Sequence, residues 1–380
     1  MAKPLGRPSR RLRLHPVQRR ADHLCRAGLG RFLQLLRQRS GLLPQVGRTP
    51  QLLTQPARRA WVVAACQTRA RWWAAATLAI VAMSTASGCS GSGPGIEARA
   101  QEAAAALAQV QRTSEVIGSA EAVLVKKCVH EKGYPSSAEP QAEPDETDLG
   151  LLPPPTRAIA EEVGYGVATR LLKAQTPDES SQWKAASDLD REAAYKAAFG
   201  DPSKIVTETF DDGYTVNVGA DGCYADVRRD LYGDLARYTR MTWIASQSLN
   251  QAKTAVAESS KWQGVASEWR VCIEGKGLNA ASSGAIRANL YEARGAVAVS
   301  SSEDRFSQYL QMRDNERELA TADADCAEQA GAPGAWIEAV STANAEDLAK
   351  NHDALVEWAA TVTDRSASAL ESAQDASRSS

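Results

Sequence analysis

The sequence predicts a mainly α-helical, bundle-like protein of two halves with one small β-hairpin, held together by disulfides. Three observations lead to this prediction. Apolar residues recur at helical spacing through most of the chain after residue 95. Apolar and polar residues alternate on both sides of an Asp-Gly turn, Asp212-Gly213. Four cysteines fall within this same region, namely Cys128, Cys223, Cys272 and Cys326.

Charge divides the chain into two unequal parts. The 380 residues include 44 Lys+Arg and 46 Asp+Glu, so the whole is nearly neutral. Residues 1–88 hold 16 of the basic residues and a single acid, Asp22, which leaves the remainder strongly acidic. A basic leader is typical of targeting segments. The acidic remainder argues against a nucleic-acid partner, because phosphates are bound by Lys and Arg that displace counterions.

An apolar run, Trp72–Thr85, follows the basic leader. It is shorter than the roughly 20 residues of a membrane span and is typical of a signal-peptide core. It leads into Ala86-Ser87-Gly88-Cys89, which resembles the lipobox of bacterial lipoprotein precursors, although Ala86 stands where the pattern more often has Leu or Val. The resemblance implies cleavage between Gly88 and Cys89, a lipid on the Cys89 thiol, and anchoring to the outer face of the cytoplasmic membrane. Plain secretion and an uncleaved anchor helix are the alternatives.

These features predict the following organisation. Residues 1–61 form an Arg-rich leader that either precedes the true start or is disordered, and residues 62–88 form the signal peptide. Residues 89–95 form a lipidated, flexible tether, because this segment is rich in Ser and Gly. The mature halves are residues 96–243 and 244–380.

Periodicity and turn residues place the elements of the first half. A helix over Ile96–Lys132 should end at Gly133, and the acidic, Pro-rich segment 135–155 should be an exposed loop. The segment 205–218 should form the hairpin, because its alternation brackets the Asp-Gly turn. We expect further helices over Ala158–Lys173, Asp188–Phe199 and Tyr224–Leu231.

The second half reads as helical throughout. Leu235–Glu274 is expected to form one long helix or two joined ones, and Trp336–Ala373 one amphipathic helix. Helices are also expected over Ser282–Ala298 and Asp304–Ala330. The serine-rich C-terminal end is expected to fray.

A short repeat relates the two halves. Cys128–Tyr134 and Cys272–Leu278 both read Cys, a β-branched residue, two variable residues, Lys, Gly and a large apolar residue. Each copy is followed by a lone cysteine, Cys223 or Cys326. Four cysteines allow three connectivities, and the repeat favours Cys128–Cys223 and Cys272–Cys326. Lys132 and Lys276 are expected to contact the last carbonyls of their helices.

The chain as a whole also resembles lipoproteins of streptomycete-type actinobacteria, and its second half fits this pattern better than its first half. The resemblance is carried by a tryptophan before a cysteine and a Gly-ended helix, Trp269–Gly277, and by the spacing of Glu318, Asp323 and Cys326. It implies an extracytoplasmic lipoprotein and no particular activity.

Motifs of known catalytic families are missing from the sequence. A Cys–His nucleophile at Cys128 and His130 competes with a disulfide. Glu318, Asp323 and Asp325 would be either an acid/base group or an exposed helix face. The tryptophans are expected in the core or along a sugar-binding groove (Trp243, Trp262, Trp269, Trp336 and Trp358). Because Cys-x-x-Cys pairs are absent and histidines are few, we expect no metal or other cofactor.

These observations together predict a lipid-anchored, non-enzymatic protein that binds a ligand or interacts with the envelope. Its expected partners are the membrane, through the lipid on Cys89, and an envelope protein or cell-wall component. The alternative is a hydrolase of cell-wall polymers that uses carboxylates.

Overall fold

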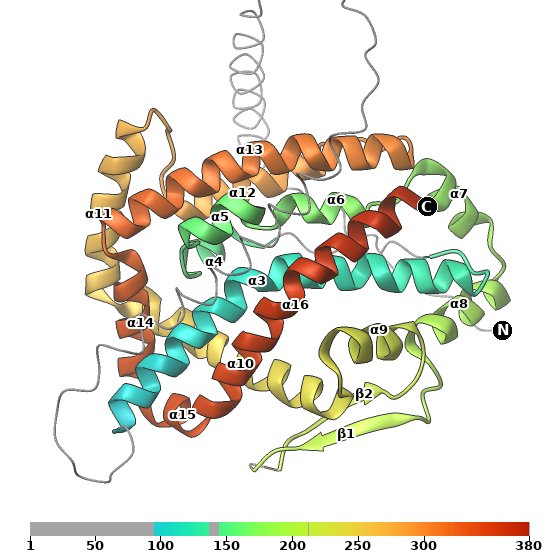
Figure 1. Cartoon of the computed structure of the whole chain (residues 1–380), viewed down its shortest axis with the longest axis horizontal. Helices are drawn as coiled ribbons and strands as arrows, with labels where there is room; N and C mark the ends of the chain where they lie inside the picture. Colours follow the sequence, from blue (N-terminus) through green and yellow to red (C-terminus); the bar gives the residue numbers. More distant parts are fainter. Residues whose placement is uncertain (1–94, 137–143, 212, 380) are drawn as a thin grey trace, which may run out of the picture. The chain divides into compact units, whose positions relative to one another are not determined.

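Two long helices, one at each end of the described chain, form the centre of the fold. The computed structural model describes residues 95–136, 144–211 and 213–379. Helix α3 (Ile96–Glu131) and helix α16 (His352–Ser379) pack extensively against each other (Figure 1). The predicted leader, the predicted signal peptide and most of the predicted tether, including Gly88 and Cys89, lie outside the described residues.

Small residues allow α3 to approach its neighbours closely. Its buried stripe includes Ala100, Ala103, Ala104, Leu107 and Ala108, which repeat at the spacing of one helix face. This stripe belongs to the first hydrophobic core. The core also contains residues of α16 and of the helices α9 (Cys223–Tyr232), α10 (Leu235–Glu258), α14 (Ala332–Ala343) and α15 (Ala345–Lys350), together with Leu171, Leu172 and Tyr309.

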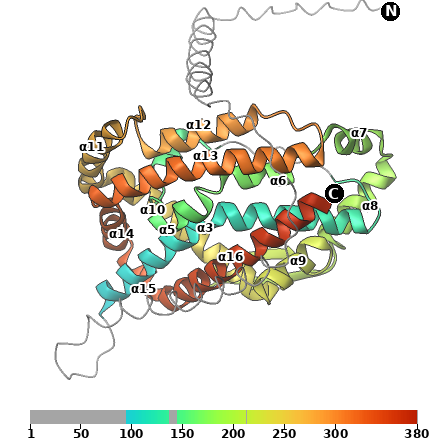
Figure 2. The ribbon, with the colours of Figure 1, turned by 45° about the horizontal axis from the view of Figure 1, so that its top comes forward.

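A second, smaller core lies among the remaining long helices. Figure 2 shows α12 (Ser283–Gly295) and α13 (Ser302–Gln329) together on one side of the molecule. They share this core with α4 (Glu146–Gly150), α5 (Arg157–Val163) and α11 (Ser260–Gly275). The remaining helical elements are the 3₁₀ turn η2 (Val167–Thr169), α6 (Arg170–Lys173), α7 (Pro177–Ala185) and α8 (Asp188–Phe199).

The predicted hairpin is confirmed. Strands β1 (Ile205–Thr209) and β2 (Thr215–Gly219) pair antiparallel, with Ile205 opposite Gly219. The hairpin is attached to α10 through Trp243, whose ring stacks on Tyr214 at 4.5 Å between centroids.

Both predicted disulfides are present, Cys128–Cys223 in the first core and Cys272–Cys326 in the second. The two copies of the repeat end their helices with the same hydrogen bonds. The N–H groups of Lys132 and Lys276 donate to the carbonyls of Cys128 and Cys272, and Gly133 and Gly277 follow with positive φ.

The repeat differs from the prediction in two respects. The ammonium groups of Lys132 and Lys276 do not hold the last carbonyls but pair with Asp226 at 3.9 Å and Asp325 at 3.0 Å. The similarity also stops before the partner cysteines, because Cys223 begins α9 whereas Cys326 lies in the last turn of α13. Helix α10 runs continuously through residues 243 and 244, where the two predicted halves meet.

The Pro-rich segment is not wholly the exposed loop that composition predicted. Glu146–Gly150 forms α4, Leu149 is buried, and Pro153, Pro154 and Pro155 are buried as well. The reason is tertiary: guanidinium groups of Arg112 and Arg287 donate to the carbonyls of Pro154 and Pro153.

The prediction of one final helix was wrong. The segment breaks into α14, α15 and α16 at Asn344 and Asn351, whose side-chain amides donate to carbonyls of the preceding turn and so compete with helix continuation. For Leu235–Glu274, the structure shows the second of the two predicted forms, two joined helices that meet at Ser259, whose hydroxyl caps α11. The C-terminal end is helical rather than frayed, since Ser377 is buried and binds the fully buried Arg305.

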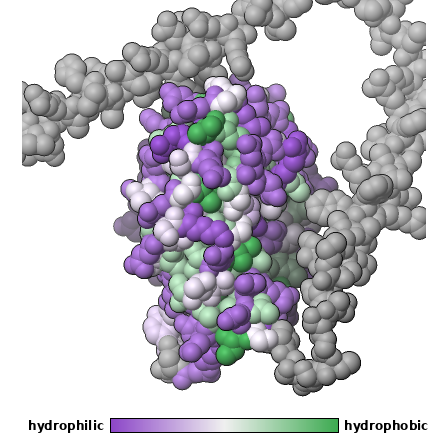
Figure 3. Space-filling model, turned by 90° about the vertical axis from the view of Figure 1, so that its left-hand side faces the viewer, coloured by the Kyte–Doolittle hydropathy of each residue, from purple (hydrophilic) through white to green (hydrophobic). Residues whose placement is uncertain are grey.

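Across the described ranges, no helix combines the length and the apolar character needed to cross a membrane. The face of the molecule that carries α11 is mainly hydrophilic, with apolar residues scattered over it (Figure 3).

Candidate functional site

The three carboxylates singled out from the sequence do not converge on one site. Asp323 is fully buried and accepts hydrogen bonds from Tyr165 Oη (2.8 Å), Trp269 Nε1 (2.7 Å) and Ser283 Oγ (2.6 Å). Asp325 pairs with Arg157 and Lys276, and Glu318 is exposed. Asp323 therefore holds three elements of the second core together. An acid/base pair would need two carboxylates that face one substrate.

Glu316 is a buried carboxylate that the sequence reasoning missed. It accepts hydrogen bonds from the backbone N–H groups of Tyr165 (2.8 Å), Val167 (2.8 Å) and Ala168 (2.7 Å). Burial raises the pKa of Glu316 to about 7, against the lowering effect of these hydrogen bonds. The sequence contained one signal that could have identified it. Glu316 lies seven residues before Asp323, so both acids fall on the same, buried face of α13.

Glycine is required where this loop approaches Glu316. Gly164 and Gly166 both have positive φ, and a Cβ on Gly164 would lie 2.6 Å from Glu316 Cγ. Glu316 is thus a structural clamp on the loop between α5 and η2.

The other candidate residues also have structural roles. Cys128 is bound in a disulfide, so no thiol is present beside His130. Burial and the nearby Lys126 lower the pKa of the His130 imidazole. Trp269, Trp336 and Trp358 are core residues, and the indole N–H of Trp336 donates to the carbonyl of Leu151.

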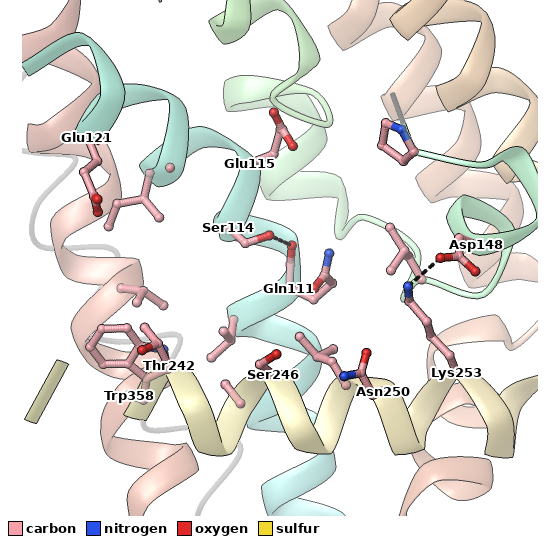
Figure 4. Close-up of a pocket in the computed structure, with 18 of the residues that line it drawn as sticks. Gln111, Ser114, Glu115, Glu121, Asp148, Thr242, Ser246, Asn250, Lys253 and Trp358 are labelled. Atoms are coloured by element: carbon pink, nitrogen blue, oxygen red, sulfur yellow. Dashed lines mark hydrogen bonds and ion pairs between the residues drawn. The ribbon is translucent and has the colours of Figure 1, made fainter. Parts of the chain in front are cut away.

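The structure instead presents a cavity of about 540 Å³ between α3, α10 and α16, next to α4. Figure 4 shows Trp358 and Glu121 toward one end and Asp148 with Lys253 at the other. A volume of this size falls within the roughly 300–1,000 Å³ range of small-molecule sites.

One face of α10 forms a polar wall of the cavity. Thr242, Ser246 and Asn250 are spaced four residues apart and so lie on one stripe (Figure 4). Opposite them, Gln111 projects from α3. Within the described residues, the side chains of Gln111, Ser246 and Asn250 make no hydrogen bond. Ser246 and Asn250 are exposed to solvent and Gln111 is half-buried, so these amide and hydroxyl groups are accessible to a ligand.

The charged groups that line the cavity are paired with opposite charges. Glu115 is held by the guanidinium of Arg170 and by Tyr291 Oη at 3.1 Å. Lys253 Nζ lies 2.8 Å from Asp148 Oδ2.

The carboxylate at the other end is held in the same manner. Glu121 accepts from Arg228 Nε at 2.9 Å and from Tyr232 Oη at 3.3 Å. Burial and the charge of Glu121 raise the pKa of Tyr238 to about 12, so this phenol stays neutral. Glu115 and Glu121 each already bind an arginine and a tyrosine. Neither of these two carboxylates is therefore free to take a proton from a substrate as a general base.

Helix α3 carries a glycine where it borders the cavity. Gly118 is exposed in the helix interior, and a Cβ placed on it would meet no atom within 4 Å. A side chain here would project into open space, so its absence leaves room in the cavity. The combination of unpaired amides and hydroxyls with paired charges suits the binding of a polar small molecule.

Comparison with protein-family models, with curated proteins and with solved structures finds no match to this chain.

Proposed function

We propose that this chain is an extracytoplasmic binding protein held at the outer face of the bacterial cytoplasmic membrane by a lipid on Cys89. Its ligand occupies the cavity between α3, α10 and α16. The observation that carries the proposal is that Gln111, Ser246 and Asn250 meet at a cavity of about 540 Å³ without hydrogen-bond partners among the described residues.

The chemistry of the cavity supports binding rather than turnover. Its uncharged donors and acceptors favour a ligand with hydroxyl or amide groups, because such groups replace water at unpaired polar side chains. Its carboxylates are already paired, Glu115 and Glu121 with arginines and Asp148 with Lys253. Anchoring by Cys89 rests on the lipobox-like sequence Ala86-Ser87-Gly88-Cys89.

The cavity is tested by capture of a ligand from an extract of the cell envelope. Native mass spectrometry should detect a bound small molecule on the wild-type protein and on Gly264→Trp, but not on Gly118→Trp. Gly264 is the matched control, because it is also an exposed glycine inside a helix with open space at its Cβ, and it does not line the cavity. Equal capture by both variants would rule out the cavity as the site.

The anchor is tested separately by labelling cells with a lipid precursor, with and without Cys89→Ser. We expect label and membrane association to be lost in the variant. If the substituted protein stays equally membrane-bound, an uncleaved anchor helix replaces the lipoprotein assignment.

A further inference from the structure

A small recess of about 50 Å³ adjoins the cavity and carries arginine side chains. The two spaces share part of their lining, including Gln111, Ser114, Glu115 and Tyr291, so the recess lies directly beside the cavity. One water needs about 10–15 Å³ by the same kind of measure. The recess therefore has room for a group larger than a single water.

Two guanidinium groups line this recess without a carboxylate partner. Arg112 comes from α3 and its Nε donates to the carbonyl of Pro154 at 2.7 Å. Arg287 comes from α12, donates to the carbonyl of Pro153 at 2.9 Å and lies over the ring of Tyr165. Within the described part of the chain, neither arginine forms an ion pair with an acid.

Arg287 in particular has unused hydrogen-bonding capacity. The residue is 7 % exposed, and its Nε is buried without a hydrogen-bond partner among the described residues. A buried guanidinium without an acid partner is unfavourable, and an oxyanion is the partner that guanidinium groups bind best.

Acids in the surroundings are occupied elsewhere. Glu115 binds Arg170 and Tyr291, Glu316 binds backbone N–H groups, and Asp323 binds three side-chain donors. Burial and the repulsion of Arg287 lower the pKa of Arg112 to about 10. An anion in the recess would relieve this repulsion.

We propose that the recess binds an oxyanion, the carboxylate or phosphate group of the ligand whose uncharged polar part fills the larger cavity. The proposal rests on the cavity being the binding site and adds the charge of the ligand. Arg112 and Arg287 hold the oxyanion, and Gln111, Ser246 and Asn250 hold the remainder.

The probes are inorganic phosphate and acetate, titrated into the full mature protein at constant ionic strength with chloride as the balancing anion. Calorimetry should detect saturable binding of phosphate, acetate or both. The probe that binds more tightly identifies the oxyanion of the ligand as a phosphate or a carboxylate. Arg112→Gln and Arg287→Lys should weaken it at least tenfold, because each loses charge-assisted hydrogen bonds. Arg270→Gln, which removes an exposed arginine of α11, should bind as the wild type does.

Equal binding by all four proteins, or no saturable binding by the wild type, would overturn the proposal. Circular dichroism establishes that each variant is folded. If Arg287→Lys does not fold, crystals soaked with selenate decide the matter. An anomalous peak beside Arg112 and Arg287 supports the recess, and its absence at saturating selenate refutes it.

The two proposals fail in different ways. If an envelope ligand is lost in Gly118→Trp but kept in Arg112→Gln, the cavity binds its ligand and the oxyanion recess is wrong. If phosphate or acetate binding depends on the arginines but no envelope ligand is captured, the recess stands and the proposed function fails.

Discussion

Buried charged side chains hold the loops and the chain end of this protein in place. Glu316 accepts three backbone N–H groups between Tyr165 and Ala168. Arg305 is fully buried and donates to the carbonyl of Ala174 and to Ser377. Because each polar group is satisfied by its partner, removal of either one leaves buried groups unpaired, which is costlier than the net gain from the bonds.

We expect Glu316→Leu to lower the free energy of unfolding by about 3 kcal/mol or more, because three buried N–H groups lose their acceptor. Urea unfolding followed by circular dichroism measures this. Glu318→Leu, two residues away but exposed, is the control and should change stability by less than about 0.5 kcal/mol. Similar losses for both variants would contradict the clamp.

Gly118→Ala should stabilise the protein by about 0.5–1 kcal/mol, because glycine is unfavourable inside a helix and the added methyl group meets no neighbour. Urea midpoints of the two proteins test this, with Gly264→Ala as a second helical glycine in open space. A loss of stability in Gly118→Ala alone would mean that the cavity wall does not tolerate a side chain.

His352 should make stability depend on pH. Its two ring nitrogens lie 2.8 Å from Glu102 and 2.7 Å from Asp353, and these partners raise its pKa although burial opposes the charge. Folding therefore favours the protonated ring. This contribution is present below the unfolded-state pKa of about 6.5 and is lost as pH rises through the higher folded-state pKa.

The difference in unfolding free energy between wild type and His352→Gln should accordingly be larger at pH 6 than at pH 9. His130, whose pKa is lowered, has the opposite effect on the pH dependence of stability. It is present in both proteins, so its contribution cancels in the difference. A difference independent of pH would show that the charge of His352 does not stabilise the fold.

Three helices end before a glycine that lies five residues after a cysteine. Gly133, Gly277 and Gly331 have positive φ, and each follows Cys128, Cys272 or Cys326 by five positions. The Lys-Gly dipeptide made two of these copies visible in the sequence. The third copy has Ala330 instead of lysine before its glycine. The N–H of Ala330 still donates to the carbonyl of Cys326 at 3.0 Å.

The disulfides close loops of 95 and 54 residues. Replacing either pair by alanine should lower the free energy of unfolding by about 4 kcal/mol on the chain-entropy account. Denaturation of each double variant, beside the wild type under non-reducing conditions, measures the two contributions. A wild type that unfolds at the same urea concentration with and without reductant would contradict this expectation.

Elements bracketed by clear capping residues could be predicted from sequence, whereas breaks fixed by tertiary contacts could not. Helix α8 occupies Asp188–Phe199, the predicted range, because Ser187 and Gly200 bracket it. Asn344 and Asn351 gave no comparable signal. The cavity escaped prediction because α3, α10 and α16 are distant in sequence, although the spacing of Thr242, Ser246 and Asn250 was a visible hint of a polar helix face.

At the scale of the whole molecule, the principal core joins the first and last described helices. Leu107 of α3 and Leu355 of α16 are both buried in it, together with Leu370, Ala373 and Ala376 near the end of α16. Stability therefore depends on the last residues of the chain.

Truncation after Ser368 should abolish cooperative unfolding, because it removes the buried end of α16 and two hydrogen bonds to the buried Arg305. Truncation after Arg378 keeps those contacts and serves as the control. Thermal melts of the two proteins make the comparison, and a cooperative melt of the shorter one near the wild-type temperature would contradict it.

The pairing of α3 with α16 also bears on how the chain is made. Among the described helices, α3 is synthesised first and α16 after the others, so α3 must wait for its main packing partner. Contacts between residues so far apart in sequence form slowly, and only once both helices have been made. We therefore expect the apolar face of α3 to stay exposed during most of synthesis, which makes the nascent chain a client for a chaperone.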